Sequence, residues 1–137
     1  MNNVMAFIPH RDPFLFVDQL IFADADCIIG VKTFDDSFFA FPGHFPEKNV
    51  VPGVILIEAM VQCGGAGVKK LGLVSKALYG LASIRNARFH GVVKPGESVE
   101  MVVKNLKASE LGIKQFGTAF CKGNKVAEAT WMCTRMK

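Results

Sequence analysis

The residues best suited to chemistry lie in one stretch of the chain, from His44 to Gln62. His44 stands in a loop bounded by prolines, and imidazole is the side chain that most often serves as a general base. Glu58 is the one carboxylate in an otherwise apolar run from Val54 to Val61. Because an ionised carboxylate is costly to bury in such a run, we expect a raised pKa, which would make Glu58 a proton donor near neutral pH.

The start of a predicted helix lies between these two groups and offers backbone amides to an oxygen atom. Pro52 has no N–H, so the first free donors are the amides of Gly53 and Val54, backed by the positive end of the helix dipole. Such amides could hold a carbonyl oxygen that gains negative charge. Gln62 lies one turn beyond Glu58 and can hydrogen-bond it on the same helix face. This set fits removal of a proton next to a carbonyl with departure of a β-hydroxyl.

Each of these features has a simpler explanation when it is taken alone. His44 could be a structural loop histidine, Glu58 could be a buried acid satisfied by an arginine or by the backbone, and the helix start could bind nothing. The other histidines have weaker contexts, since His10 is expected to pack within a loop and His90 to end a strand. The combination of base, amide donors and acid is what indicates an enzyme.

The elements that must position these residues form an α+β pattern. Pro52 suits the first helical position, and the helix is expected to run to about Leu71 and to end at Gly72. A short helical turn is expected over 2–9 and an irregular, functional segment over 35–51. Strands are expected over 14–22, 27–34, 77–93, 98–108, 111–121 and 125–135, the last two joined by a hairpin at Gly123-Asn124.

A helix that is apolar on all sides must be covered on all sides. We therefore expect one domain over 1–137 in which a curved antiparallel sheet wraps round the long central helix, while a second copy covers the rest. Gly64, Gly65 and Gly67 each cost up to about 1 kcal/mol inside a helix, which would make sense if another backbone packed closely there.

Composition narrows the possible partners and compartments. Half of the 137 residues are hydrophobic, so apolar surface should remain for an interface and an oligomer is expected. The net charge of +4 suits an acidic partner, but the scattered cations include no basic helix or aromatic platform for nucleic acid. The apolar stretch 50–68 contains Pro52, Glu58 and Gln62, which favours a core helix over a membrane span.

The N-terminus and the cysteines favour a cytoplasmic protein. The first residues lack the basic and apolar regions of a signal peptide. The four cysteines include no C-x-x-C pair, which argues against a zinc or redox motif. We expect them to be free, buried and reduced, and Cys121 and Cys133 to stand out of register across the predicted hairpin.

The chain resembles the β-hydroxyacyl-acyl-carrier-protein dehydratases of the FabZ type, which have the hotdog fold. The gap of fourteen positions from His44 to Glu58 is that family's spacing, and the sister family that also isomerises has an aspartate at the glutamate position. The matching stretches span nearly the whole chain: Pro9-His10-Arg11, Pro13-Phe14-Leu15, Val17-Asp18, Gly43-His44-Phe45-Pro46, Val51-Pro52-Gly53-Val54, Glu58-Ala59-Met60 with Gln62, Ala87-Arg88-Phe89, and Val93 with Pro95-Gly96.

The resemblance implies a hydro-lyase that converts (3R)-3-hydroxyacyl-acyl-carrier-protein to the trans-2-enoyl product in fatty acid or related acyl-chain biosynthesis. His44 would take the C2 proton, and the amide of Gly53, helped by Val54, would hold the thioester carbonyl. Glu58 would protonate the leaving 3-hydroxyl, and Gln62 would orient Glu58 or a water. No metal or dissociable cofactor is implied, because phosphopantetheine arrives with the substrate.

The resemblance further implies a homodimer or a hexamer built as a trimer of dimers, with the histidine and the acid of one site coming from different subunits. The acidic acyl carrier protein would be the partner, with Arg85, Arg88 and Lys94 as candidate contacts. Ala40-Phe41-Pro42 and Glu47-Lys48-Asn49 depart from the family's pattern, which leaves the loop shape and acyl chain length open. Two other functions stay open: a hotdog acyl-thioesterase and a non-catalytic acyl-carrier-binding module.

Overall fold

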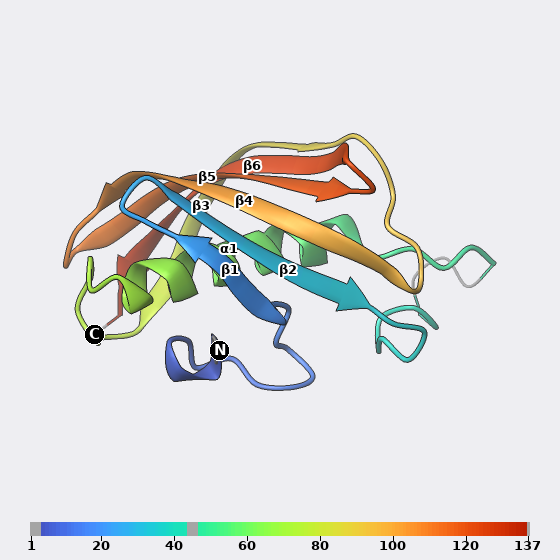
Figure 1. Ribbon diagram of the computed structural model, residues 1–137, viewed down its shortest axis with the longest axis horizontal. Coiled ribbons are helices and arrows are strands. Elements are labelled where there is room, and N and C mark those ends of the chain that lie inside the picture. The colour runs from blue at the N-terminus through green and yellow to red at the C-terminus, as the bar shows by residue number, and fades with distance from the viewer. Residues whose placement is uncertain (1–3, 44–46, 137) are drawn as a thin grey trace.

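The computed structural model describes residues 4–43 and 47–136, and it consists of one long helix and an antiparallel sheet (Figure 1). The sheet has six strands in the order β1-β2-β4-β5-β6-β3. The elements are η1 (Val4–Ala6), β1 (Gln19–Ala23), β2 (Cys27–Phe34), α1 (Gly53–Lys70), β3 (Tyr79–Phe89), β4 (Glu97–Ala108), β5 (Gly112–Cys121) and β6 (Asn124–Arg135). This confirms the predicted α+β arrangement.

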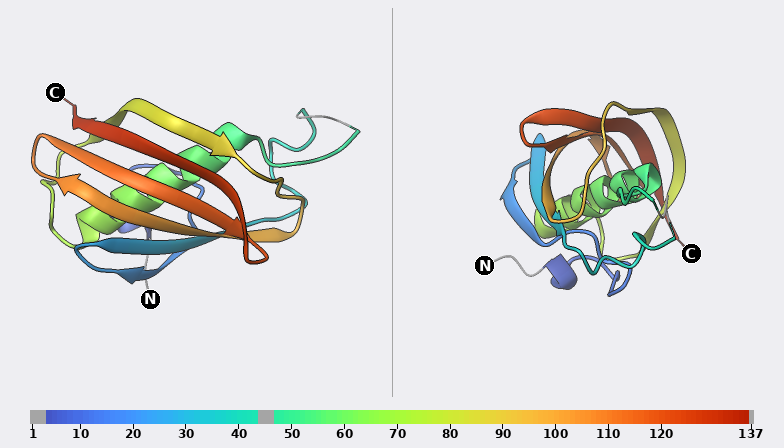
Figure 2. Two further views of the ribbon diagram at one scale, coloured as in Figure 1. Left: turned by 90° about the horizontal axis from the view of Figure 1, so that it is seen from above. Right: turned by 90° about the vertical axis from the view of Figure 1, so that its right-hand side faces the viewer.

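The sheet curls around α1, and the N-terminal segment with η1 lies on the opposite side of the helix (Figure 2). The alternation predicted for β4 is observed, because Val99, Met101 and Val103 are all buried in the core. Ile8 and Phe16 of the N-terminal segment are buried in the same core. Within the described residues, no helix combines the length and hydropathy that a membrane span requires.

Both ends of α1 follow the expected chemistry, with a small shift at the start. Pro52 is the N-cap rather than the first helical residue, and its carbonyl accepts the amides of Ile55 and Leu56 at 2.9 and 3.3 Å. At the other end Gly72 adopts a φ of +69°, which glycine reaches without steric cost. The amides of Gly72 and Leu73 donate to the carbonyls of residues 69 and 68, which closes the helix as a Schellman motif.

Side chains of the sheet, rather than another backbone, occupy the space that two of the helix glycines leave free. A Cβ on Gly67 would lie 2.5 Å from Ile28 of β2, and one on Gly64 would collide with the amide of Gln115 on β5. The Gln115 amide donates to the Gly64 carbonyl at 3.1 Å and accepts the indole N–H of Trp131 at 3.1 Å. Gly65 differs, because a Cβ there would meet only Ile8, at 3.9 Å.

Two strand predictions need correction. The chain from 14 to 18 is not a strand, and β1 begins only at Gln19. The strand predicted over 77–93 is shorter, and its pairing with β6 shifts register between Leu81 and Ser83 and between Arg85 and Arg88.

The hairpin between β5 and β6 turns one residue earlier than predicted. Its central residues are Lys122 and Gly123, which both have positive φ (53° and 80°), as a type I′ turn requires. Cys121 therefore pairs with Asn124, and Cys133 with Ile113. All four cysteines are free, and burial raises the pKa of Cys63 to about 12 and that of Cys133 to about 11.

The glycines of α1 allow a matched test of how tightly the helix packs. We expect Gly67→Ala to lower the free energy of unfolding by about 1–3 kcal/mol, because the new methyl group must displace Ile28. Gly65→Ala should instead be neutral or stabilise by up to about 1 kcal/mol, because alanine is the better helix former and the site is open. Urea unfolding of both variants measures the difference, and equal effects would contradict this account of the packing.

Candidate active site

Glu58 opens onto a largely apolar groove along one face of α1. The groove has a volume of about 380 Å³ and lies between the helix, the N-terminal segment and the start of β3. A larger hollow of about 550 Å³ lies between the N-terminal segment and residues 35–39, but none of the described candidate residues lines it. The residues that line the groove include Phe7, Ile8, His10, Phe14, Glu58, Val61, Gln62, Lys69, Leu78, Tyr79, Leu81, Ile113 and Met136.

The carboxylate of Glu58 is held from two directions. The side-chain amide of Gln62 donates to Oε2 of Glu58 at 3.0 Å, which is the i, i+4 contact that the sequence predicts. Nε2 of His10 lies 3.6 Å from the same oxygen. The Glu58 side chain keeps 21% of its surface exposed, so it is neither sealed in the core nor free to rotate in water. This arrangement presents a carboxyl group of fixed orientation to the groove.

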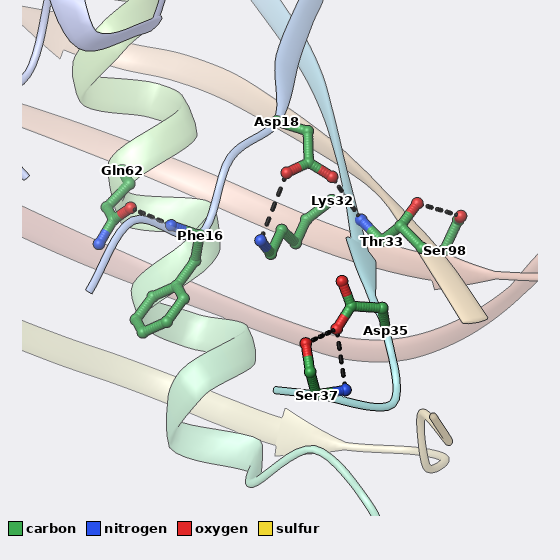
Figure 3. Close-up of polar contacts among 8 residues, drawn as sticks. All are labelled: Phe16, Asp18, Lys32, Thr33, Asp35, Ser37, Gln62 and Ser98. Carbon is green, nitrogen blue, oxygen red and sulfur yellow. Dashed lines mark hydrogen bonds and ion pairs between the residues drawn. The ribbon is translucent and has the colours of Figure 1, made fainter. Parts of the chain in front are cut away.

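Gln62 joins the helix to the N-terminal segment (Figure 3). Its carbonyl oxygen accepts the buried amide of Phe16 at 2.8 Å, and its nitrogen donates to the carbonyl of Phe14 at 3.0 Å as well as to Glu58. The Phe14 carbonyl and the Phe16 amide thus pair with a side chain instead of a neighbouring strand, which keeps this part of the chain out of the sheet. Both amide hydrogens of Gln62 are used within the chain, so its direct partner is Glu58.

A carboxylate anchors the far end of the same segment. Asp18 accepts the amide of Thr33 at 2.7 Å and the ammonium group of Lys32 at 3.3 Å (Figure 3). The amide of Asp18 also donates to the carbonyl of Val31 at 2.8 Å, just before β1 begins. The segment from 14 to 18 is thus attached to α1 at one end and to β2 at the other, which fixes the wall of the groove near Glu58.

The start of α1 carries the amides proposed to bind a carbonyl. Within the described residues, the N–H groups of Gly53 and Val54 have no acceptor, since hydrogen bonding to Pro52 begins with Ile55. The ring of Phe89 packs where a Cβ of Gly53 would lie, 2.6 Å from that position, so this glycine also permits contact with β3. Val54 is 72% exposed and lies one turn before Glu58, on the same helix face. Neither Gly53 nor Val54 lines the groove itself.

The histidines differ from expectation. His44, the predicted base, lies outside the described residues. His10, expected only to pack within a loop, approaches Glu58 and stacks on Phe14 with ring centroids 6.4 Å apart. Its Nδ1 is buried without a partner among the described residues. Sequence spacing gave no sign of this contact, because it joins residues far apart in the chain; the Pro9-His10-Arg11 motif was the available signal.

The remaining polar side chains that the structure describes near the site do not form a cluster suited to a metal ion. Among the residues that the structure describes, no group of three His, Cys, Asp or Glu side chains is placed to bind a metal ion. His90, the third histidine, lies instead beside Glu128 of β6, with Nε2 3.1 Å from the carboxylate. That contact and the neighbouring Lys125 lower the pKa of Glu128.

The role of Gln62 as a link predicts a specific loss of stability. Gln62→Met should lower the free energy of unfolding by about 1–3 kcal/mol, because it leaves the buried Phe16 amide without an acceptor. The control is Gln19→Met, which makes the same change at an exposed position of β1. Urea unfolding compares the two, and equal losses would show that the link to residues 14–16 contributes nothing.

Comparisons with known proteins agree with this architecture. The family model of the FabA-like domain matches residues 8–130. The 3-hydroxyacyl-[acyl-carrier-protein] dehydratase FabZ of Solibacter usitatus is 39% identical over 134 residues, covering 97% of this chain and 83% of that protein. FabZ of Pasteurella multocida is 38% identical over 137 residues (98% and 90%), and FabZ of Sinorhizobium fredii is 41% identical over 131 residues (94% and 84%).

Solved structures support the hotdog fold. The dehydratase heterocomplex ApeI:P from Xenorhabdus doucetiae matches with a TM-score of 0.86 at 18% identity, covering 100% of this chain and 93% of that one. A hypothetical thioesterase with coenzyme A from Streptococcus pneumoniae matches with a TM-score of 0.66 at 10% identity, covering 96% and 90%. At these identities the likeness concerns the fold alone. With the family model and the relatives taken together, this chain belongs to the FabZ-type 3-hydroxyacyl-[acyl-carrier-protein] dehydratases.

Proposed function

We propose that this chain dehydrates (3R)-3-hydroxyacyl-acyl-carrier-protein to the trans-2-enoyl thioester in fatty acid or related acyl-chain biosynthesis, acting in the cytoplasm as one domain over 1–137. The observation that carries the proposal is the carboxylate of Glu58, oriented by Gln62 at an apolar groove in a chain of this family. An apolar groove accommodates an acyl chain, and an oriented carboxyl group can deliver a proton to one defined atom of it.

The proposed reaction divides two proton transfers between two side chains. His44 removes a proton from C2, while Glu58 gives a proton to the 3-hydroxyl, which leaves as water. The electron pair of the C2–H bond forms the C2–C3 double bond. The proton on His44 then returns to Glu58 through solvent, so the enzyme is restored after each turnover. The reaction as proposed uses no metal or dissociable cofactor.

In this proposal the helix start binds the thioester carbonyl. Removal of the C2 proton places negative charge on that oxygen, and the amides of Gly53 and Val54 offer donors to it. Val54, Glu58 and Gln62 follow one another at intervals of four residues, so they share one face of α1. Side chains on a helix lean toward its N-terminus, which brings the Glu58 carboxyl toward the amides. The amides of Gly53 and Val54 and the carboxyl group of Glu58 can therefore act on one short part of the substrate.

We further propose that two chains build each site, with β3 at the interface, in a homodimer that can assemble to a hexamer. β3 is an edge strand, and most of its side chains are exposed, including the large apolar Leu81, Ile84 and Phe89. An exposed edge with apolar side chains is a template for pairing with another strand. A second copy of β3 would cover this surface and extend the sheet across both chains.

A mixing experiment tests the assignment of His44 and Glu58 together with the shared site. His44→Ala and Glu58→Gln alone should each abolish formation of the enoyl thioester. In dimers assembled at random from the two variants, half pair unlike chains and each of these holds one intact site, so about a quarter of wild-type turnover should return. Ultraviolet absorbance of the enoyl thioester measures turnover.

Four results would contradict the proposal in different ways. Near wild-type turnover by the single variants would rule out the assigned roles of His44 and Glu58. If mixing restored no turnover, both groups of a site would lie in one chain. Release of free thiol without enoyl product would identify a thioesterase. Saturable binding of the acylated carrier without any turnover would identify a non-catalytic binding module.

The proposed carrier is the acidic acyl carrier protein, and electrostatics should govern its association. Arg85 and Arg88 on β3 and Lys94 after it are exposed, and the chain carries a net charge of +4. We expect the affinity to fall as salt rises, because ions screen exposed charges over about 10 Å at 0.1 M. Titration calorimetry at low and high salt measures this, and Lys94→Glu, which lies outside β3, should weaken binding more than Lys107→Glu on β4. Affinity that is independent of salt would refute the electrostatic contribution.

A further inference from the structure

The Glu58 groove extends along α1 as far as Lys69, which also lines an adjoining hollow of about 450 Å³. Gln62, Gly65 and Lys69 follow Glu58 on one helix face and all line the groove. Lys69 is eleven residues beyond Glu58, which corresponds to roughly 16 Å along the helix axis. The walls between these two residues are mainly apolar, with contributions from Val61, Leu78, Leu81 and Ile113. An acyl chain whose C3 lies at Glu58 is therefore directed toward the ammonium group of Lys69.

The ammonium group of Lys69 is fixed in place at this end of the groove. It donates to the carbonyl of Ala77 and lies over the ring of Tyr79, 5.4 Å from the centroid. The Tyr79 hydroxyl in turn donates to the carbonyl of Glu110 at 2.6 Å and contacts the hydroxyl of Ser75 at 3.0 Å. The loop after α1 and the start of β3 thus hold the ammonium group in one orientation among polar groups.

The Lys69 ammonium group can form further hydrogen bonds. A lysine ammonium group has three N–H donors, and Lys69 uses one of them to bind the carbonyl of Ala77. Within the described residues, no carboxylate lies within ion-pair distance of Lys69. A methyl group at this position would displace water from the ammonium group without forming a hydrogen bond to it, which is unfavourable. An oxygen acceptor would replace that water with a charge-assisted hydrogen bond.

We propose that Lys69 is a specificity residue that binds an oxygen acceptor at the far end of the acyl chain. The preferred substrate is then a 3-hydroxyacyl thioester whose terminal carbon carries a carboxylate or a hydroxyl, rather than a simple fatty acyl chain that ends in a methyl group. This inference rests on the proposed dehydratase function and names the substrate class of the same site. The groove length sets which chains reach Lys69, and the cation sets which chain ends are favoured there.

The test uses carrier-bound 3-hydroxyacyl thioesters in pairs of equal length, one ending in a methyl group and the other in a carboxylate. The series spans chains that stop short of Lys69 and chains that reach it. For wild-type protein we expect kcat/KM to favour the carboxylate about tenfold, and only at lengths that reach Lys69. Lys69→Met keeps the length of the side chain without its charge and should abolish or reverse the preference, whereas Lys69→Arg should retain it.

Two controls separate this effect from folding and from carrier docking. Lys107→Met removes the same charge from an exposed position of β4 and should leave the preference unchanged. Thermal unfolding of Lys69→Met reports whether the variant folds, and Lys69→Arg supplies a second variant with the contact preserved. Binding of the same thioester pairs to Glu58→Gln, measured by calorimetry, gives a readout that does not need turnover.

The outcomes distinguish this inference from the proposed function. Dehydration of methyl-ended substrates with no preference for the carboxylate, or with a preference that survives in Lys69→Met, would overturn the role of Lys69 and leave the dehydratase assignment standing. Absence of enoyl product from every thioester would overturn the dehydratase assignment. In that case equal binding of both chain ends to Glu58→Gln would overturn the role of Lys69 as well.

Discussion

The side-chain amide of Gln62 is the interaction on which the site depends. One amide group accepts the Phe16 N–H and donates to the Phe14 carbonyl and to Glu58, so it joins helix, N-terminal segment and carboxylate. A buried backbone N–H without a partner would cost about 1–3 kcal/mol, which gives the segment a strong reason to stay where it is. The segment carries His10 and Phe14 into the groove, and hence the shape of the site follows from the satisfaction of backbone groups near one glutamine.

The packing of α1 makes this arrangement rigid. The helix is enclosed by the sheet on one side and by the N-terminal segment on the other, and side chains from β2 and β5 fill the space over Gly67 and Gly64. These contacts prevent the helix from sliding or rotating against the sheet. Glu58, Gln62 and Lys69 therefore keep fixed positions relative to the groove, although all three lie on a helix whose interior glycines would weaken it in isolation.

The sequence predicted best what depends on local chemistry. Pro52 and Gly72 marked the helix ends to within a residue, alternation marked β4, and the interval of four residues placed Gln62 on Glu58. Predictions failed where a distant partner decides the structure. The apolar run from 14 to 18 reads as a strand, yet a glutamine on α1 takes its hydrogen bonds.

Tertiary contacts explain the other differences between sequence and structure. Apart from the Pro9-His10-Arg11 motif, nothing near His10 in the sequence indicates that its ring reaches Glu58, since the two meet only when the N-terminal segment folds back on α1. The hairpin was placed one residue late because Gly123-Asn124 is the stronger turn signal, whereas the chain adopts positive φ at Lys122 and Gly123. In both cases strand register or long-range packing, rather than the local pattern, decides the structure.

The two ends of the groove have opposite electrostatic character, and this constrains any ligand that occupies its whole length. At one end the ligand meets the Glu58 carboxyl group, and at the other end it meets the Lys69 ammonium group. Between them the walls are mainly apolar and offer few hydrogen bonds, so a ligand gains there by burying hydrocarbon. A chain with polar groups at both ends and hydrocarbon between them matches this pattern at every point, whereas a simple fatty acyl group matches it at one end only.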